Sequence, residues 1–203
     1  YGSNLLVGIA ELAGVTGPLD LFTLEVDAGG AAVHASASLV DNRTGDPVLV
    51  VEGPVDQGEL LVPGVAHLPG AGGSRWRTDV TLLNPGDEPL TCRLDYLPET
   101  PLPDDHGLDL TLQAHQALRL EDVLGSLVGA DAATKGFLRL RGLGGSVAPL
   151  VTARTYNLAA SGTFGQRLEV YGPDELAGAG ETRAIAGVTT GDPVGDGVGF
   201  RTN

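Results

Sequence analysis

Residues 76–86 read WRTDVTLLNPG, and this short sequence joins a strand pattern to a turn. Residues 79–83 are expected to form a β-strand, because polar and apolar side chains alternate over 79–82 as they do in a half-buried strand. The Asn-Pro-Gly at 84–86 then predicts a turn, because these residue types suit tight-turn backbone geometry. The same combination of alternating segment and turn recurs along the chain, and it predicts an all-β protein.

Short alternating segments are closely spaced throughout the sequence. We expect strands at residues 22–27, 33–40, 48–51, 62–67, 79–83, 91–97, 108–112, 117–120, 136–141 and 147–156. Glycines at 29–30 and within 142–145 predict hairpins between the strands that flank them. Short helices are expected at 4–13 and 121–129. Many short strands separated by glycine and proline are typical of a β-sandwich.

Parts of the sequence occur more than once. The WRTD of residues 76–79 returns as FRTN at 200–203, and ASLVD at 37–41 matches ARTYN at 153–157. The two expected helices match each other as well. These offsets indicate a repeating unit of about 115 to 125 residues, which is close to the size of one β-sandwich domain.

The repeat divides the chain into three parts. Residues 1–57 correspond to the second half of one copy, 58–172 to a complete copy, and 173–203 to a linker with the first strands of a further copy. We therefore expect tandem β-sandwich (Ig-like) units, each with one short helix. Because the copies at both ends are partial, we interpret the chain as a processed protein or a fragment of a longer one.

Composition excludes several classes of function. The net charge of −14, with 26 acidic residues against 12 Lys and Arg, argues against nucleic-acid binding, since phosphates require clustered basic side chains. No apolar run reaches the ~20 residues of a transmembrane helix. Cys92 is the only cysteine, so no intrachain disulfide can form, and we expect it to be a small core residue.

No residue pattern indicates catalysis. The four histidines lack the spacing of a zinc site, and the sequence contains neither a nucleophile elbow nor a phosphate-binding loop. We expect no enzymatic activity and no cofactor other than calcium. Hard cations bind clustered carboxylates, and the candidate calcium ligands in the acidic loops are Asp104, Asp105, Asp192 and Asp196.

The repeated aromatic–arginine pair is a candidate packing feature. We expect the ring to pack at the edge of the sandwich, with the arginine stacked or paired with a carboxylate. Packing is favoured over ligand binding, because the two copies preserve residue types rather than a catalytic set. The candidate residues for contacts between copies are Trp76, Arg77, Phe200 and Arg201.

Residues 76–86, together with DNRTGDP at 41–47, resemble β-sandwich repeat modules of large secreted bacterial proteins. Such modules have no assigned function, often occur in tandem and sometimes lie beside extracellular proteases. The resemblance implies an exported, noncatalytic module at the cell surface or outside the cell. It implies no active residues.

We expect a structural or adhesive extracellular protein that associates with itself or with neighbouring repeats. The first, partial copy lacks counterparts of the strands at 62–118, so it should expose sheet edges and apolar faces. Residues 184–203 begin such a missing half. One subunit can therefore lend them to the next by strand addition, and repetition head to tail gives a filament.

Two alternatives remain open. Residues 184–203 can stay within their own chain, in a fragment of a longer array. The chain can also be a carbohydrate- or calcium-binding accessory module of a secreted enzyme, although nine aromatic residues offer little material for a sugar-binding platform.

Overall fold

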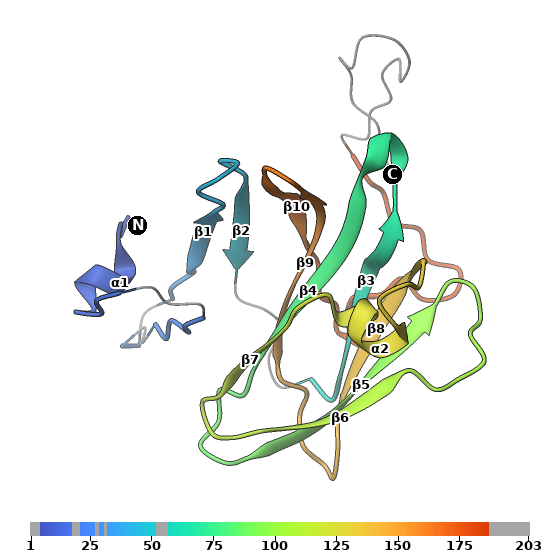
Figure 1. Cartoon of the computed structure of the whole chain (residues 1–203). Coiled ribbons are helices and arrows are strands. Elements are labelled where there is room, and N and C mark those ends of the chain that lie inside the picture. The colour runs from blue at the N-terminus through green and yellow to red at the C-terminus, as the bar shows by residue number, and fades with distance from the viewer. Residues whose placement is uncertain (1–4, 18–20, 27–28, 31, 52–56, 187–203) are drawn as a thin grey trace. The chain divides into compact units, whose positions relative to one another are not determined.

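The computed structural model describes residues 5–17, 21–26, 29–30, 32–51 and 57–186 (Figure 1). In chain order the elements are α1 (Ile9–Leu12), β1 (Ser36–Val40), β2 (Pro47–Val51), β3 (Glu59–Pro69), the 3-10 turn η1 (Ala71–Gly73), β4 (Arg75–Leu83), β5 (Leu90–Pro98), β6 (Gly107–Leu112), β7 (Ala117–Leu120), α2 (Val123–Val128), β8 (Thr134–Gly142), β9 (Leu150–Ala159), β10 (Gly162–Leu168) and the 3-10 turn η2 (Pro173–Glu175). The expected all-β class is confirmed. Within the described residues, neither helix is long and apolar enough to cross a membrane.

The chain divides into two compact units, residues 1–173 and 174–203. The first unit contains all the strands named above. The second begins within η2, and Arg183 pairs there with Glu181 at 3.2 Å. The repeat limits expected after residues 57 and 172 stay predictions.

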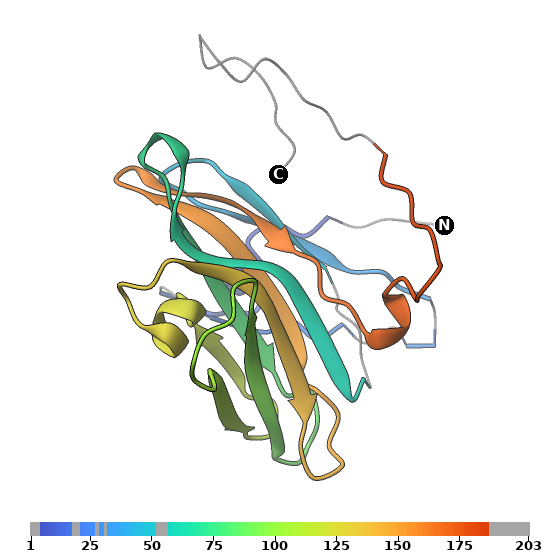
Figure 2. The ribbon, with the colours of Figure 1, turned by 90° about the vertical axis from the view of Figure 1, so that its right-hand side faces the viewer.

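Two antiparallel sheets form the sandwich of the first unit. One has the strand order β3-β8-β5-β6, and the other has β10-β9-β4, with β7 on the opposite side of β4. Strand β3 belongs to both, because most of it pairs with β8 while Leu68 and Pro69 pair with β4. Its register shifts between Pro63 and Val65, at a bulge of the kind that bends a strand. Figure 2 shows β3 as a long teal strand.

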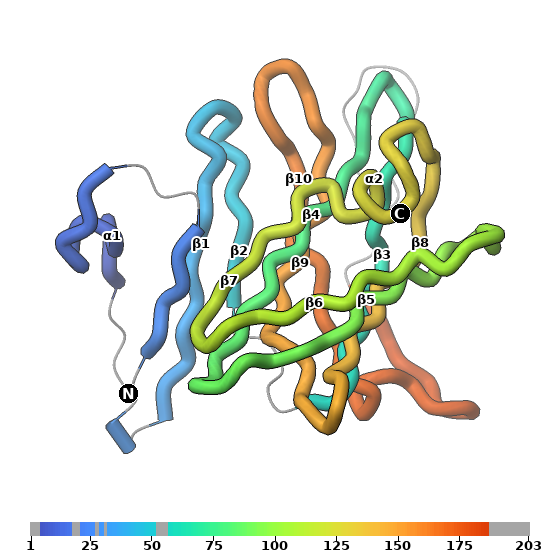
Figure 3. Tube along the Cα trace, turned by 60° about the horizontal axis from the view of Figure 1, so that its bottom comes forward, coloured from blue at the N-terminus to red at the C-terminus, as the bar shows by residue number. Residues whose placement is uncertain are grey.

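The hydrophobic core lies between these sheets. Alternate residues of β3, β4, β5 and β8 point inward, and α2 packs against β3 and β4 (Figure 3). Fully buried side chains include Leu60, Val62, Val80, Leu82, Leu94, Leu138, Leu140 and Leu124. Each such side chain contributes about 1.5–3 kcal/mol relative to an exposed one, so the sandwich carries most of the apolar stabilisation of the chain.

Cys92 of β5 is also fully buried, as expected for a small core residue. Burial and, to a smaller extent, the charge of Asp109 raise the pKa of its thiol to about 11. A thiol of this kind is protonated at neutral pH and is a poor nucleophile.

Strands β1 and β2 form a separate two-stranded hairpin. Of the residues between 5 and 51 that the structure describes, only Val48 joins the buried hydrophobic residues. Of the twenty large apolar residues that the structure describes as exposed, twelve lie between Leu5 and Leu49. The N-terminal segment therefore contains strand and helix sequences without a core of their own.

Four local features differ from the expectations. Residues 22–26 form no strand, because a strand needs a hydrogen-bonded neighbour and none pairs with them within the described ranges. The glycines at 142–145 do not close a hairpin, since β8 pairs with β3 and β5 while β9 pairs with β4 and β10. Strand β10 was not predicted, and α1 is shorter than the helix expected at 4–13.

Candidate assembly site

The turn between β1 and β2 contacts the outer edge of β10. Thr163 donates two hydrogen bonds to Asp41 Oδ2, from its backbone N at 3.0 Å and from Oγ1 at 2.8 Å. The backbone N of Gly165 donates to Asp46 Oδ2 at 2.9 Å. Two carboxylates thus accept hydrogen bonds from two backbone amides at the edge of the sheet.

Two further residues of the turn extend this contact. Thr44 Oγ1 donates to the carbonyl oxygen of Thr163 at 3.0 Å, and Arg43 Nη2 donates to the carbonyl oxygen of Ala160 at 3.1 Å. The turn therefore meets both the donors and the acceptors that β10 and its preceding loop present. We call the hydrogen bonds between residues 41–46 and residues 154–165 the edge clamp.

Arg154 of β9 completes the edge clamp. Its Nη2 lies 3.0 Å from Asp46 Oδ2, and its guanidinium stands 5.2 Å from the centroid of the Tyr156 ring. Backbone hydrogen bonds, first from Thr163 and then from Arg43, hold the pKa of Asp41 well below its usual range. Asp41 is therefore an anion at neutral pH, as its role as acceptor requires.

The sequence of the turn explains its shape. Asp41 Oδ1 accepts a hydrogen bond from the backbone N of Arg43 at 2.8 Å, in the local pattern that aspartate forms in turns. Gly45 has a φ of 73°, in the left-handed region that glycine adopts without a steric penalty. The turn is thus held by its own contacts, so both carboxylates are in place before they meet β10.

Beside the edge clamp, the hairpin and the segment before it expose apolar side chains. Leu39 and Val40 of β1 are each 52% exposed, and Leu49 of β2 is 57% exposed. The preceding residues show the same property, with Phe22 and Leu24 more than half exposed. These exposed apolar side chains make the segment a candidate for contacts with another chain.

The predicted packing residues Trp76 and Arg77 lie in β4. Trp76 is half-buried and pairs across the strands with Leu68, and Arg77 Nε lies 3.2 Å from Asp122 Oδ2. Arg77 thus has the carboxylate partner expected for it. Phe200 and Arg201, like the calcium candidates Asp192 and Asp196, lie outside the described residues, and the role of all four stays a prediction.

Asp122 also contacts His67, in a pair that resembles the base and orienting acid of a hydrolase. His67 Nδ1 lies 2.7 Å from Asp122 Oδ1, but His67 Nε2 lies 3.0 Å from the carbonyl oxygen of Ala130. His67 is 2% exposed, so its second nitrogen is not presented to a substrate. With the backbone N of Asp122 donating to Asp79 at 2.9 Å, the contacts fix the start of α2 on β3 and β4.

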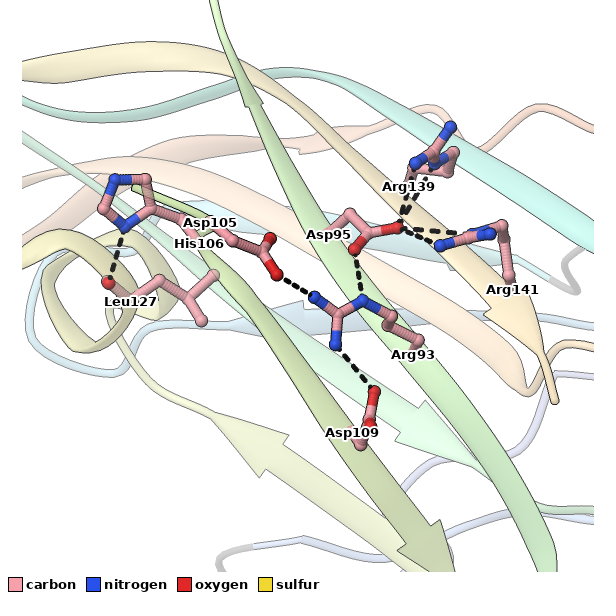
Figure 4. A network of polar contacts seen from close by, with 8 residues as sticks. All are labelled: Arg93, Asp95, Asp105, His106, Asp109, Leu127, Arg139 and Arg141. Carbon is pink, nitrogen blue, oxygen red and sulfur yellow. Dashed lines mark hydrogen bonds and ion pairs between the residues drawn. The ribbon is translucent and has the colours of Figure 1, made fainter. Parts of the chain in front are cut away.

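A second polar network covers the outer face of the sheet that contains β5 and β8 (Figure 4). Arg93 Nε donates to Asp95 Oδ1 at 2.6 Å, while Arg139 and Arg141 reach Asp95 Oδ2 at 3.1 and 2.8 Å. Burial alone would raise the pKa of Asp95, but the three arginines outweigh it and lower the pKa. The network ties β5 to β8 through a nearly buried carboxylate.

Arg93 also binds two carboxylates nearer to β6. Its Nη2 and Nη1 lie 2.5 Å from Asp105 and 2.9 Å from Asp109 (Figure 4). Three arginines thus face three aspartates, and the charges within this network balance. The network therefore carries no excess positive charge of its own to attract an anionic ligand.

The calcium candidates Asp104 and Asp105 lie in the loop before β6. Asp104 is exposed, and Asp105 is paired with Arg93. The next residue, His106, directs Nδ1 to the carbonyl oxygen of Leu127 at 3.2 Å, away from the aspartates. In the part of the chain that the structure describes, no group of three or more His, Cys, Asp or Glu residues is arranged to hold a metal.

Comparison with known proteins gives little further information. No family model matches the chain, and no curated protein matches it. Among solved structures it is similar to the crystal structure of Thermotoga maritima 1070, with a TM-score of 0.41 and 13% identity over 58% of this chain and 96% of that one. A similarity of this strength carries no argument about function.

Proposed function

We propose that this chain is a noncatalytic structural repeat protein of the cell surface or extracellular space, and that its partial N-terminal copy is completed by a strand from another copy. The observation that supports this most directly is the concentration of exposed apolar side chains in residues 5–51. In the sandwich, side chains of the same kinds lie between two sheets. Among the described residues of the N-terminal segment, no second layer covers the β1–β2 hairpin.

The free edge of β1 supports the same proposal. Among the described residues, β1 pairs only with β2. Asp41 N donates to Asp46 O at 3.0 Å, and because an antiparallel ladder alternates, the amides of Ser38 and Val40 point away from β2. An incoming strand can bind these amides and cover Leu39 in the same step.

The repeat predicts the register of that incoming strand. The match of 37–41 with 153–157 places β1 in the position of β9, which pairs with β4. Trp76 lies opposite Asn157 in that ladder. By the two matches, Phe200 of the donor would lie opposite Asp41 of the acceptor, and Asn203 opposite Ser38.

Substitutions at Ser38 test the edge of β1 with a matched pair. Ser38→Pro removes the amide that points outward, while Ser38→Ala changes the side chain and keeps the amide. We expect light scattering and negative-stain electron microscopy to show assemblies for the unchanged chain and for Ser38→Ala. Ser38→Pro and a chain ending at residue 183 should remain monomeric.

Two results would contradict the proposal. Assemblies that persist without residues 184–203 would show that another surface holds the copies together. Monomers in all four samples at high concentration would exclude self-assembly. The alternative of a calcium- or carbohydrate-binding module would then be tested by the effect of calcium and glycans on the melting temperature.

A further inference from the structure

The edge clamp provides hydrogen-bond partners for backbone groups at the edge of β10 without adding a strand. Unpaired backbone groups at the edge of a sheet can recruit another edge, and proteins commonly protect them with charged side chains or a covering loop. At β10, the outward amides of Thr163 and Gly165 are bound by the carboxylates of Asp41 and Asp46. A carboxylate offers no further donor, so the ladder cannot continue beyond it.

The turn of the complete copy lacks these acids. The match of 37–41 with 153–157 places Asn157 where the first copy has Asp41, and five residues later Gly162 stands where it has Asp46. The side chain of Asn157 is already used, since its Oδ1 accepts a hydrogen bond from the backbone N of Arg75 at 2.8 Å. The β9–β10 turn therefore cannot clamp a neighbouring edge in the same way.

We propose that Asp41 and Asp46 close the edge of β10, so that this side of the sandwich cannot pair with a second copy and strand addition is directed to β1. The proposal rests on the function proposed above, and it adds a direction to the assembly. The edge of β10 is blocked in cis by the preceding partial copy, while the edge of β1 is left open. Such a difference makes the contact between copies heterologous, as a head-to-tail assembly requires.

Isosteric neutral variants distinguish the effect of the edge clamp from the effect of the net charge of the chain. Asp41→Asn with Asp46→Asn keeps the shape of the turn, removes two charges and replaces acceptor oxygens with amide groups. Asp131→Asn with Asp174→Asn removes two charges from exposed residues and serves as the control. All are made in the full chain, and again together with Ser38→Pro, which blocks the edge of β1.

Two measurements on each variant test the proposal. Backbone hydrogen exchange, read by NMR at Thr163 and Gly165, should accelerate about tenfold in the Asp41/Asp46 variant and stay unchanged in the control. Light scattering should then show the mass of the Asp41/Asp46 variant rising with concentration even when Ser38→Pro is present, because the opened edge of β10 now pairs between copies.

Either of two results would overturn the proposal. Unchanged exchange at both amides would show that the edge clamp does not protect them. Faster exchange with a constant mass would show that the edge of β10 does not associate even when it is open. Failure of Ser38→Pro alone to lower the mass would contradict the proposed function instead, and the exchange result would still stand.

Discussion

The sandwich of residues 57–173 and the N-terminal segment of residues 5–51 contain the same kinds of local sequence, yet only the sandwich buries them. Leu94 in β5 is fully buried, whereas Leu49 in β2 is 57% exposed. Both belong to regular antiparallel ladders. The difference shows that a strand pattern and a turn are sufficient for a hairpin, while a core also requires a second layer of strands.

The largest effect is expected when the same leucine atoms are removed from each of the two regions. Leu94→Ala should lower the free energy of unfolding by about 3 kcal/mol, because it leaves a cavity in a closed core. Leu49→Ala should change it by less than about 0.5 kcal/mol, as is usual for a surface residue. Urea unfolding followed by the fluorescence of the only tryptophan, Trp76, measures both.

Repeating the Leu49→Ala measurement at several protein concentrations makes this test sharper. If strand addition covers the hairpin, the cost of Leu49→Ala should grow where the chain assembles, since binding to the folded state adds to apparent stability. A large cost for Leu49→Ala in a monomer would contradict the comparison, because it would mean that this side chain is buried within its own chain.

Sequence patterns predicted most of the strands, including β1 and β2, but missed β10 and wrongly placed a strand at 22–26, for a physical reason. Residues 117–120 alternate, and the structure has β7 there because β4 provides its hydrogen-bonding partner. Residues 22–26 alternate as clearly and form no strand. Alternation describes which face a residue can take, whereas pairing depends on distant segments that a local pattern does not contain.

The contacts of the site were less predictable than the strands. Arg77 was expected to stack or to pair with a carboxylate, and it pairs with Asp122. The edge clamp was missed, because DNRTGD at 41–46 is also an ordinary turn sequence and its partner strand β10 was not recognised. Charged residues at both ends of one turn were the available signal, but they do not identify the edge that they bind.

A smaller effect is expected from the polar network of Figure 4, which the hairpin lacks. Asp95→Asn leaves Arg93, Arg139 and Arg141 around a neutral, nearly buried side chain, and should cost about 2 kcal/mol, in the range for hydrogen bonds to charged groups. Asp109→Asn, on a side chain that is 62% exposed, should cost under about 1 kcal/mol. Equal losses in urea unfolding would show that Asp95 is not the centre of the network.

The smallest effect on stability is expected from acid, which should weaken the contact between the β1–β2 hairpin and β10. The hydrogen bonds from Thr163 and Arg43 lower the pKa of Asp41 in the folded chain, while the unfolded chain titrates near the ordinary value of about 3.9. A lowered pKa means that the contribution of Asp41 to stability is complete above the unfolded value. It is lost as the pH falls toward the folded value.

Hydrogen exchange at Thr163 measures this release directly. Its protection, taken relative to an unstructured chain at the same pH, should be constant from pH 7 to 5 and decline below about 4. The other charged groups that contact this edge are Asp46, Arg43 and Arg154, and the Asp41/Asp46 variant removes the charge of both carboxylates. The Asp41/Asp46 variant should therefore show low protection at every pH. A decline between pH 7 and 5 would assign the release to a histidine instead, and the hairpin would then be held by contacts other than its two carboxylates.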